Sequence, residues 1–307
     1  MDHPLSPRGA FSPPGGPPSA DSPDRPVRRA PKPGSFRLVV VDVDGTLLDP
    51  SREVTADVRE VVATAIRKGV MFTIATGRLV RSALHVAEQA GITVPVIANG
   101  GAIIADPLSR RYLRAYKLPG GTAEVLEATR GEDVLRYLFL GDEIFIERED
   151  PASAAYSRSL GVPMEIVPDL GTHFRALTAA EGRYAGEEAT MVVLRAPVEK
   201  VPALREKYRG IFKGRLMVTS TMPHFVDFMP PEATKAEALR ELCEILGVGL
   251  DETIAIGDGI NDLDMMKEAG LGVLVANASP TLWADADYVT SAPYHLGVAE
   301  VLHKFIS

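Results

Sequence analysis

The sequence predicts an α/β fold in which a doubly wound parallel sheet is interrupted by an inserted α+β unit. Strand and helix patterns alternate over residues 36–100 and again over 224–307, which is typical of a parallel sheet covered by helices. The stretch 101–223 lacks this alternation and contains strand patterns close together. An apolar run at 38–41 ends in acidic residues, as expected of a buried strand that leads into a binding site.

The N-terminal half of the sheet is predicted from a βαβαβ pattern. Short apolar runs bounded by turn residues indicate buried strands, and longer amphipathic segments indicate helices. Strands are expected at 38–41, 70–75 and 95–98, and helices at 55–67 and 79–90.

The same alternation of strand and helix patterns occurs after the insert and predicts the other half of the sheet. Helices are expected at 235–246 and 262–269, strands at 253–256 and 272–275, and further helical segments at 280–284 and 296–305. Ligands of such a sheet bind at the carboxyl ends of the strands.

The insert is predicted to be a separate α+β unit. Two of its strand patterns lie close together, as in a hairpin. Strands are expected at 134–140, 143–147, 191–195 and 216–220, and helices at 123–129, 151–160 and 198–208. The stretch 161–188 carries glycine and proline and receives no assignment.

Residues 1–35 are rich in proline, with glycine and serine between, and should be disordered because they cannot bury a core. The alternative is a proline-rich ligand for a partner domain. We expect that deleting this tail changes the melting temperature and the activity of the protein little. A large loss of either, measured against the full chain, would show that the tail docks on the rest of the protein.

Composition excludes several classes of protein. The net charge of −8, from 41 acidic and 33 basic residues, argues against nucleic acid as the main partner. A single cysteine, Cys243, excludes an internal disulfide framework and is expected in a helix as a small core residue. No apolar stretch approaches the roughly 20 residues of a membrane span, so a cytoplasmic protein without a membrane partner is expected. Protein partners cannot be identified from the sequence.

The first chemical motif is Asp42-Val43-Asp44-Gly45-Thr46, directly after the first strand. Side chains at positions i and i+2 of a strand point to the same side, so Asp42 and Asp44 can converge on one ligand. Two neighbouring carboxylates repel each other unless a cation joins them. The pair therefore predicts a metal, although Asp-Gly alone is also a common turn signal.

Three further segments are expected at the same edge of the sheet. Thr76 and Gly77 follow a strand and open a helix, where backbone N–H groups can bind an anion, although Thr76 alone would also be an ordinary N-cap. Lys235 opens a later helix. The last segment, after another apolar strand, contains Asp258, Asn261 and Asp262. Carboxylates for a hard cation, with a hydroxyl and an ammonium group, fit a phosphoryl group with Mg²⁺.

At these residues the sequence resembles the phosphatase branch of the haloacid dehalogenase (HAD) superfamily, and within it the Cof-type (HAD-IIB) phosphatases. The resemblance covers 36–307 and is carried by the phrases at 42–47, 75–78, 99–100 and 257–262, in order and spacing. It implies a Rossmann-like catalytic core, 36–100 plus 224–307, with an inserted α+β cap, 101–223. Two departures are Ala236 and Ala276-Asn277-Ala278, where the family often has glycine after the lysine and a Gly-Asn phrase.

The resemblance also implies roles for individual residues. Asp42 would be the nucleophile and Asp44 the general acid and base. The phosphoryl group would be held by Thr76, Gly77 and Lys235, with Asn261 nearby. The ligands of Mg²⁺ would be Asp42, Asp258, Asp262 and the backbone carbonyl of Asp44.

These inferences predict a Mg²⁺-dependent phosphatase that hydrolyses small phosphomonoesters through an aspartyl-phosphate. Sugar phosphates, nucleotides and cofactor phosphates all stay open as substrates. The alternatives are a phosphomutase of the same fold and a non-catalytic sensor of a phosphorylated ligand. Arg78 is left out of the catalytic set, and the turn at Asn99, Gly100 and Gly101 is either a domain-boundary turn or a substrate contact.

Overall fold

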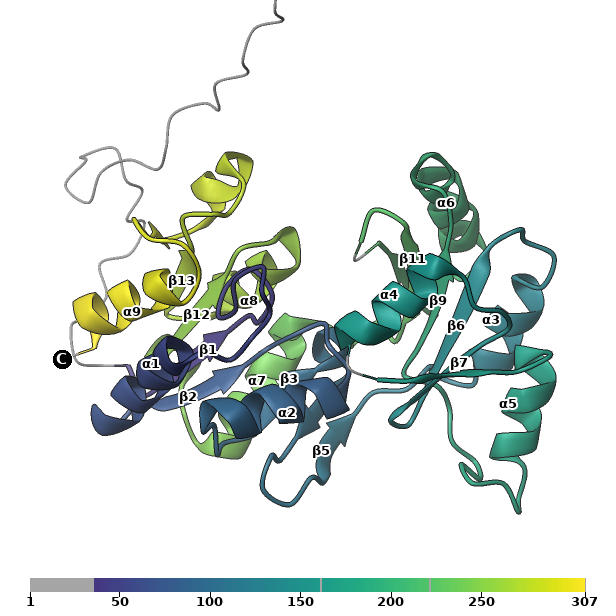
Figure 1. The fold of residues 1–307 in the computed structure, drawn as a ribbon, viewed down its shortest axis with the longest axis horizontal. Coiled ribbons are helices and arrows are strands. Elements are labelled where there is room, and N and C mark those ends of the chain that lie inside the picture. The colour runs from purple at the N-terminus through teal and green to yellow at the C-terminus, as the bar shows by residue number, and fades with distance from the viewer. Residues whose placement is uncertain (1–35, 161, 221, 307) are drawn as a thin grey trace, which may run out of the picture.

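The computed structural model describes residues 36–160, 162–220 and 222–306. The proline-rich segment 1–35, with its predicted disorder, lies outside the described residues. In the described part, two α/β units lie side by side, one on each side of a narrow connection (Figure 1). No helix within these ranges is long and apolar enough to cross a bilayer.

The first unit is built on a five-stranded parallel sheet. Its strand order is β14-β13-β12-β1-β2. In chain order the strands are β1 (Leu38–Val41), β2 (Met71–Ile74), β12 (Thr253–Gly257), β13 (Leu271–Leu274) and β14 (Tyr288–Val289). The parallel sheet is as predicted, and β14 is an additional edge strand.

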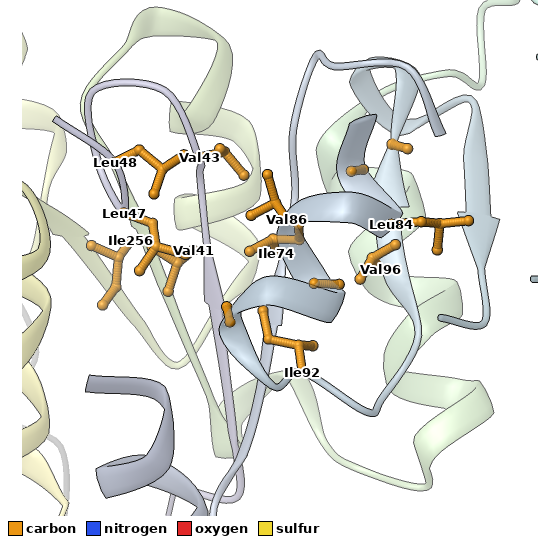
Figure 2. Packing of buried hydrophobic residues seen from close by; sticks show 14 of the residues in the cluster. Val41, Val43, Leu47, Leu48, Ile74, Leu84, Val86, Ile92, Val96 and Ile256 are labelled. Carbon is orange, nitrogen blue, oxygen red and sulfur yellow. The ribbon is translucent and has the colours of Figure 1, made fainter. Parts of the chain in front are cut away.

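Helices cover both faces of this sheet, so every residue of β1 is buried, and its side chains alternate between the two faces. Val39 and Val41 pack with α1, α2 and α9, whereas Leu38 and Val40 pack with α7 and α8. These helices are α1 (Ala56–Arg67), α2 (Val80–Ala90), α7 (Lys235–Leu246), α8 (Leu263–Glu268) and α9 (Tyr294–Phe305). Figure 2 shows the first layer, in which Val41 and Ile256 lie near Leu47 of the loop after β1.

The third predicted strand does not extend the parallel sheet. β3 (Val96–Ala98) pairs antiparallel with β4 (Ile103–Ala105), which pairs with β5 (Tyr112–Ala115). Only an isolated bridge between Ala75 and Ile97 joins β3 to the strand before it. The 3₁₀ turn Asn99–Gly101, whose three residues all have positive φ, reverses the chain directly after β3, so β4 runs back antiparallel beside it.

The second unit contains a six-stranded mixed sheet of order β10-β11-β9-β6-β7-β8, in which only β7 and β8 are parallel. Its strands are β6 (Leu135–Leu140), β7 (Glu143–Ile146), β8 (Met164–Ile166), β9 (Met191–Arg195), β10 (Met217–Thr219) and β11 (Phe225–Met229). The predicted hairpin is β6–β7. The unassigned stretch 161–188 includes β8 and an unpredicted helix, α5 (Leu170–Thr178).

The two faces of this sheet have different partners. Leu138 and Phe228 point into a core formed with three of the unit's helices, whereas Tyr137 and Phe225 belong to the cluster shared with the first unit. Helix α4 (Pro151–Leu160) contributes Tyr156 to this second face. The three helices on the other face are α3 (Thr122–Ala128), α5 and α6 (Val201–Ile211).

The described residues also form five short 3₁₀ helices. Three of them carry turns that matter for the site or replace a predicted helix: Asn99–Gly101, Ile260–Asp262 and Pro280–Asp285, the last where a helix over 280–284 is expected. The other two are Val198–Lys200 and Leu250–Glu252.

The residue boundaries of the two units stay a prediction. The strand pairing favours later boundaries than 101 and 223, because β4 and β5 pair with β3, and β11 pairs with β9 in the six-stranded sheet. We therefore propose that the chain passes between the units near Lys117 and near Pro230.

Candidate active site

Asp42 lies directly beyond the carboxyl end of β1 and is 5 % exposed. Its N–H donates to the carbonyl of Ile256, which continues the sheet by one residue. The following loop turns at Gly45, where φ is +88°. This positive φ favours glycine, and a Cβ on Gly45 would also lie 2.4 Å from Oδ2 of Asp258, so the Asp258 side chain would have to shift.

Lys235 reaches Asp42 from the first residue of α7. Thr234 caps this helix by accepting a hydrogen bond from the N–H of Glu237, which fixes the backbone of the lysine. The buried Nζ donates to Oδ1 of Asp42 at 2.5 Å and to Oδ1 of Asp262 at 2.6 Å. Burial opposes the charge of Lys235, but the two carboxylates outweigh it and raise its pKa, so the lysine is an ammonium ion.

Two more carboxylates follow β12. The buried Asp262 accepts the N–H groups of Asp258 and Gly259 on Oδ2, at 3.2 and 3.0 Å. Asp258 accepts the hydroxyl of Thr46 on Oδ1 at 3.0 Å. The loops after β1 and β12 are thus joined through side chains, as expected for neighbouring strand ends of a parallel sheet.

The three carboxylates Asp42, Asp258 and Asp262 suit a divalent cation. One oxygen from each lies within 4.8 Å of the others. Burial raises the pKa of Asp42 to about 7, with the attraction of Lys235 opposing and the repulsion of Asp262 adding to it. Burial and the charge of Asp262 also raise the pKa of Asp258. A hard, oxygen-preferring cation that binds between these buried carboxylates would offset their mutual repulsion.

Asp44 is not part of this group of three carboxylates, and its side chain is bound by an arginine. Arg78 donates Nε and Nη2 to its two oxygens, both at 2.7 Å. Burial works against ionisation of Asp44, but the hydrogen bonds and charge of Arg78 prevail and lower its pKa. Sequence reasoning left Arg78 out, although its place directly after Thr76 and Gly77 was a signal for it. The predicted metal contact of Asp44 concerns its backbone carbonyl and stays a proposal.

Thr76 and Gly77 follow β2, the neighbour of β1. The buried Thr76 accepts the N–H of Arg78 on Oγ1 at 3.1 Å, so it orders this turn. Gly77 is exposed, and a Cβ there would meet no atom within 4 Å. Asn261 is exposed in the 3₁₀ helix Ile260–Asp262, outside the group of three carboxylates.

The turn Asn99–Gly101 links these elements to the second unit. The carbonyl of Thr76 accepts the N–H of Gly100, and the side-chain oxygen of Asn99 accepts the N–H of Val80 at the start of α2. The amide nitrogen of Asn99 donates to the hydroxyl of Thr190 at 3.3 Å. This bond favours a structural linking role for Asn99, whose side-chain amide is engaged on both sides.

Gly101 offers a test of this turn. Its φ is +109°, and an added Cβ would lie 2.2 Å from the carbonyl carbon of Thr234, next to Lys235. We expect Gly101→Ala to lower the free energy of unfolding by about 3 kcal/mol, since backbone strain and a backbone clash combine. Gly120→Ala is the matched control, because Gly120 also has positive φ but meets nothing within 4 Å. Equal losses in urea melts would contradict a special role for the close approach.

Asn277, in one of the two segments that depart from the family pattern, supports the nucleophile loop. Its Nδ2 donates to the carbonyl of Gly45 at 2.8 Å, and its Oδ1 accepts the N–H of Tyr294 at 3.1 Å. A structural role for Asn277 cannot be predicted from local sequence, because the bond to Gly45 spans 232 positions of the chain.

Comparisons with known proteins agree with this geometry. The family model of haloacid dehalogenase-like hydrolases matches residues 39–302. The chain is 26 % identical to the phosphatase YwpJ of Bacillus subtilis, covering 88 % of this chain and 100 % of that one. It is 28 % identical to a phosphoglycolate phosphatase of Methanothermobacter thermautotrophicus, covering 88 % and 99 %.

Solved structures show the same architecture. A haloacid dehalogenase-like hydrolase from Bacteroides thetaiotaomicron superposes with a TM-score of 0.77 at 25 % identity, over 88 % of this chain and 99 % of that one. The fold class predicted from the sequence, a parallel core with an inserted mixed-sheet cap, is confirmed. The chain belongs to the haloacid dehalogenase-like hydrolases and is a Cof-type phosphatase of that family, a phosphoric monoester hydrolase.

Proposed function

We propose that this phosphatase transfers the phosphoryl group of a small phosphomonoester to Asp42 and then to water, with Mg²⁺ as its metal. The observation that carries the proposal is the buried contact of Lys235 with Asp42 and Asp262, beside Asp258 at the same sheet edge. A nucleophilic carboxylate, an ammonium group and a set of oxygen ligands are the parts that phosphoryl transfer requires.

In the first step a carboxylate oxygen of Asp42 attacks phosphorus, and the ester oxygen leaves with the bonding electrons. Asp44 must be protonated at this point, against the lowering of its pKa by Arg78, and donates its proton to that oxygen, so the leaving group departs as an alcohol. Lys235 is held as an ammonium ion and stabilises negative charge on the phosphoryl oxygens. In the second step Asp44 takes a proton from the water that attacks phosphorus, and the carboxylate of Asp42 is regenerated.

The proposed metal ligands are Asp42, Asp258, Asp262 and the backbone carbonyl of Asp44. Bound there, Mg²⁺ would supply positive charge that offsets the repulsion between Asp42 and the incoming phosphate. Thr76, Gly77 and Asn261 are proposed to contact the phosphoryl group, because they lie on the loops after β2 and β12.

Metal removal gives a direct test. We expect phosphate release to vanish in excess chelator and to return with Mg²⁺, because the carboxylates are oxygen ligands suited to a hard cation. Added Mg²⁺ should also raise the melting temperature, since a ligand that binds only the folded state stabilises it. The control is Asp264→Asn, an exposed carboxylate on α8, which should respond to Mg²⁺ as the parent does. Full turnover in metal-free buffer would refute the metal assignment.

The substrate is a phosphorylated metabolite whose leaving group is not fixed by the family. The names of similar proteins include a phosphoglycolate phosphatase and a phosphatase of 5-amino-6-(5-phospho-D-ribitylamino)uracil, two different leaving groups. A screen of phosphate release over about a hundred metabolites suits this spread, since fold alone does not specify the substrate. Binding without phosphate release from any of them would favour the sensor alternative.

A further inference from the structure

Two arginines lie beside the single carboxylate of Asp44. Arg78 is only 10 % exposed at its side chain and is occupied by the two-pronged contact with Asp44. Nε of Arg52 lies 3.6 Å from Oδ1 of Asp44, and its side chain is 48 % exposed. One carboxylate balances one of the two guanidinium groups, so a positive charge remains on the exposed one, Arg52.

The backbone conformation of its loop places Arg52 beside Asp44. Its φ is +60°, in the left-handed region where a residue with a side chain is strained by about 1 kcal/mol. A tight turn holds it there, because its N–H donates to the carbonyl of Asp49, and Ser51 donates to the Asp49 side chain. The arginine is therefore placed by its loop, and its contact with Asp44 at 3.6 Å is an ion pair that leaves the N–H donors of the guanidinium available.

The charge of Arg52 also acts on a side chain of the cap. Burial raises the pKa of Tyr156 on α4, the charge of Asp227 adds to this, and the charge of Arg52 opposes it. Arg52 thus lies close enough to act on a side chain of the second unit. The other arginine of that face, Arg195, is paired with Asp150 at 2.7 Å. Among the described residues, Arg52 thus has Asp44 as its ion-pair partner and shares that carboxylate with Arg78.

The position of Arg52 bears on the choice of leaving group if Asp44 is the general acid, so the inference rests on the proposed function. An acid that protonates the ester oxygen lies next to the leaving group, and Arg52 then borders the atoms attached to that oxygen. A single residual positive charge matches a singly charged carboxylate, which a guanidinium binds through two parallel hydrogen bonds.

We propose that Arg52 is a specificity-determining residue that favours phosphomonoesters whose leaving group carries a carboxylate close to the ester oxygen.

Matched substrate pairs test this preference. We would compare kcat/KM for 2-phosphoglycolate against 2-hydroxyethyl phosphate, and for 3-phosphoglycerate against glycerol 3-phosphate, with Mg²⁺ present. In each pair a carboxylate replaces a neutral hydroxymethyl group and the phosphate ester is kept. The parent should favour the carboxylate substrates, and Arg52→Gln should reduce that preference about tenfold. This factor is at the lower end of the effect of a hydrogen bond to a charged group, because the Arg52 side chain is half exposed.

Two further variants separate charge from general damage. Arg52→Lys should keep part of the preference, because it keeps the charge and loses the planar fork. Arg81→Gln, an exposed arginine on α2, should keep all of it. High salt should weaken the preference of the parent and leave Arg52→Gln nearly unchanged, since screening acts on the charge pair.

The outcomes are distinguishable. An Arg52→Gln enzyme that hydrolyses both members of each pair in the same ratio as the parent overturns the role of Arg52 and leaves the proposed phosphatase mechanism intact. A parent that hydrolyses neutral esters but neither carboxylate also overturns it. No phosphate release by the parent from any ester, with Mg²⁺ present, would overturn the proposed function and this inference together.

Discussion

Asp42→Asn is expected to reduce phosphate release by roughly 10⁵-fold or more, for every leaving group, because the amide cannot form the covalent intermediate. The fold should survive, since asparagine has nearly the same shape and Asp262 remains as a partner of Lys235. Turnover of alkyl and aryl phosphates, together with the melting temperature, provides the measurement.

The effect of this substitution on stability has a definite sign. Burial raises the pKa of Asp42 to about 7, above the ordinary value of 3.8. The metal-free fold therefore loses stability as pH rises from about 4 to about 7, because Asp42 becomes ionised, and the loss is complete above pH 7. Asp42→Asn removes that charge and should melt no lower than the parent at pH 8 in chelator. It should gain less from added Mg²⁺, because one ligand is lost.

Asp264→Asn serves as the control, since it removes an exposed carboxylate of the same sheet edge. Turnover of Asp42→Asn within tenfold of the parent would sink the nucleophile assignment. An unfolded Asp42→Asn protein would instead point to a structural requirement for the pair with Lys235.

Asp44→Asn is expected to slow alkyl phosphates by roughly 10² to 10⁴, the usual contribution of general acid–base catalysis. With an aryl phosphate the leaving group needs little protonation, so the first step partly survives. The second step still lacks its base. The result should be a burst of phenolate followed by slow turnover, with the phosphoryl group trapped on Asp42.

Rapid-quench mass spectrometry can look for the added mass on the peptide that contains Asp42. The structure adds a control, because Asp44→Asn also removes the charged partner of Arg78. A melting temperature measured beside the kinetics separates that loss from the catalytic one. A folded Asp44→Asn enzyme with neither burst nor adduct would contradict the double role of Asp44.

Much of the core could be predicted because its signals are local. The strands and helices from residue 38 to 90 follow from apolar runs and amphipathic periods, and β1 needs no distant information. The closeness of Asp258 to Asp42 follows from a rule about strand ends in parallel sheets, because β1 and β12 are neighbours. Lys235, 193 positions from Asp42, opens α7 after a strand of the other sheet, so that rule does not place it. The strand at β3 was also expected, but its partner depends on a turn with three positive φ values.

Other features could not be predicted because they depend on side-chain placement across the fold. Arg78 and Arg52 meet Asp44 only once the loops after β1 and β2 are in place. Strand β11 was missed because its buried Asp227 interrupts the apolar pattern that marks a strand. Its assignment to the second sheet needs the pairing with β9, which no local pattern contains.

The pairing of β1 with β12 has a consequence for how the chain is made. The two strands lie far apart in the chain: Arg37, directly before β1, and Glu252, directly before β12, are 215 positions apart. At about 5–20 residues per second of synthesis, β1 waits roughly ten to forty seconds for its neighbour. During that time the all-apolar edge of β1 is open to other strands. Until β12 has been made, one edge of the strand that precedes the nucleophile therefore stays without its native partner.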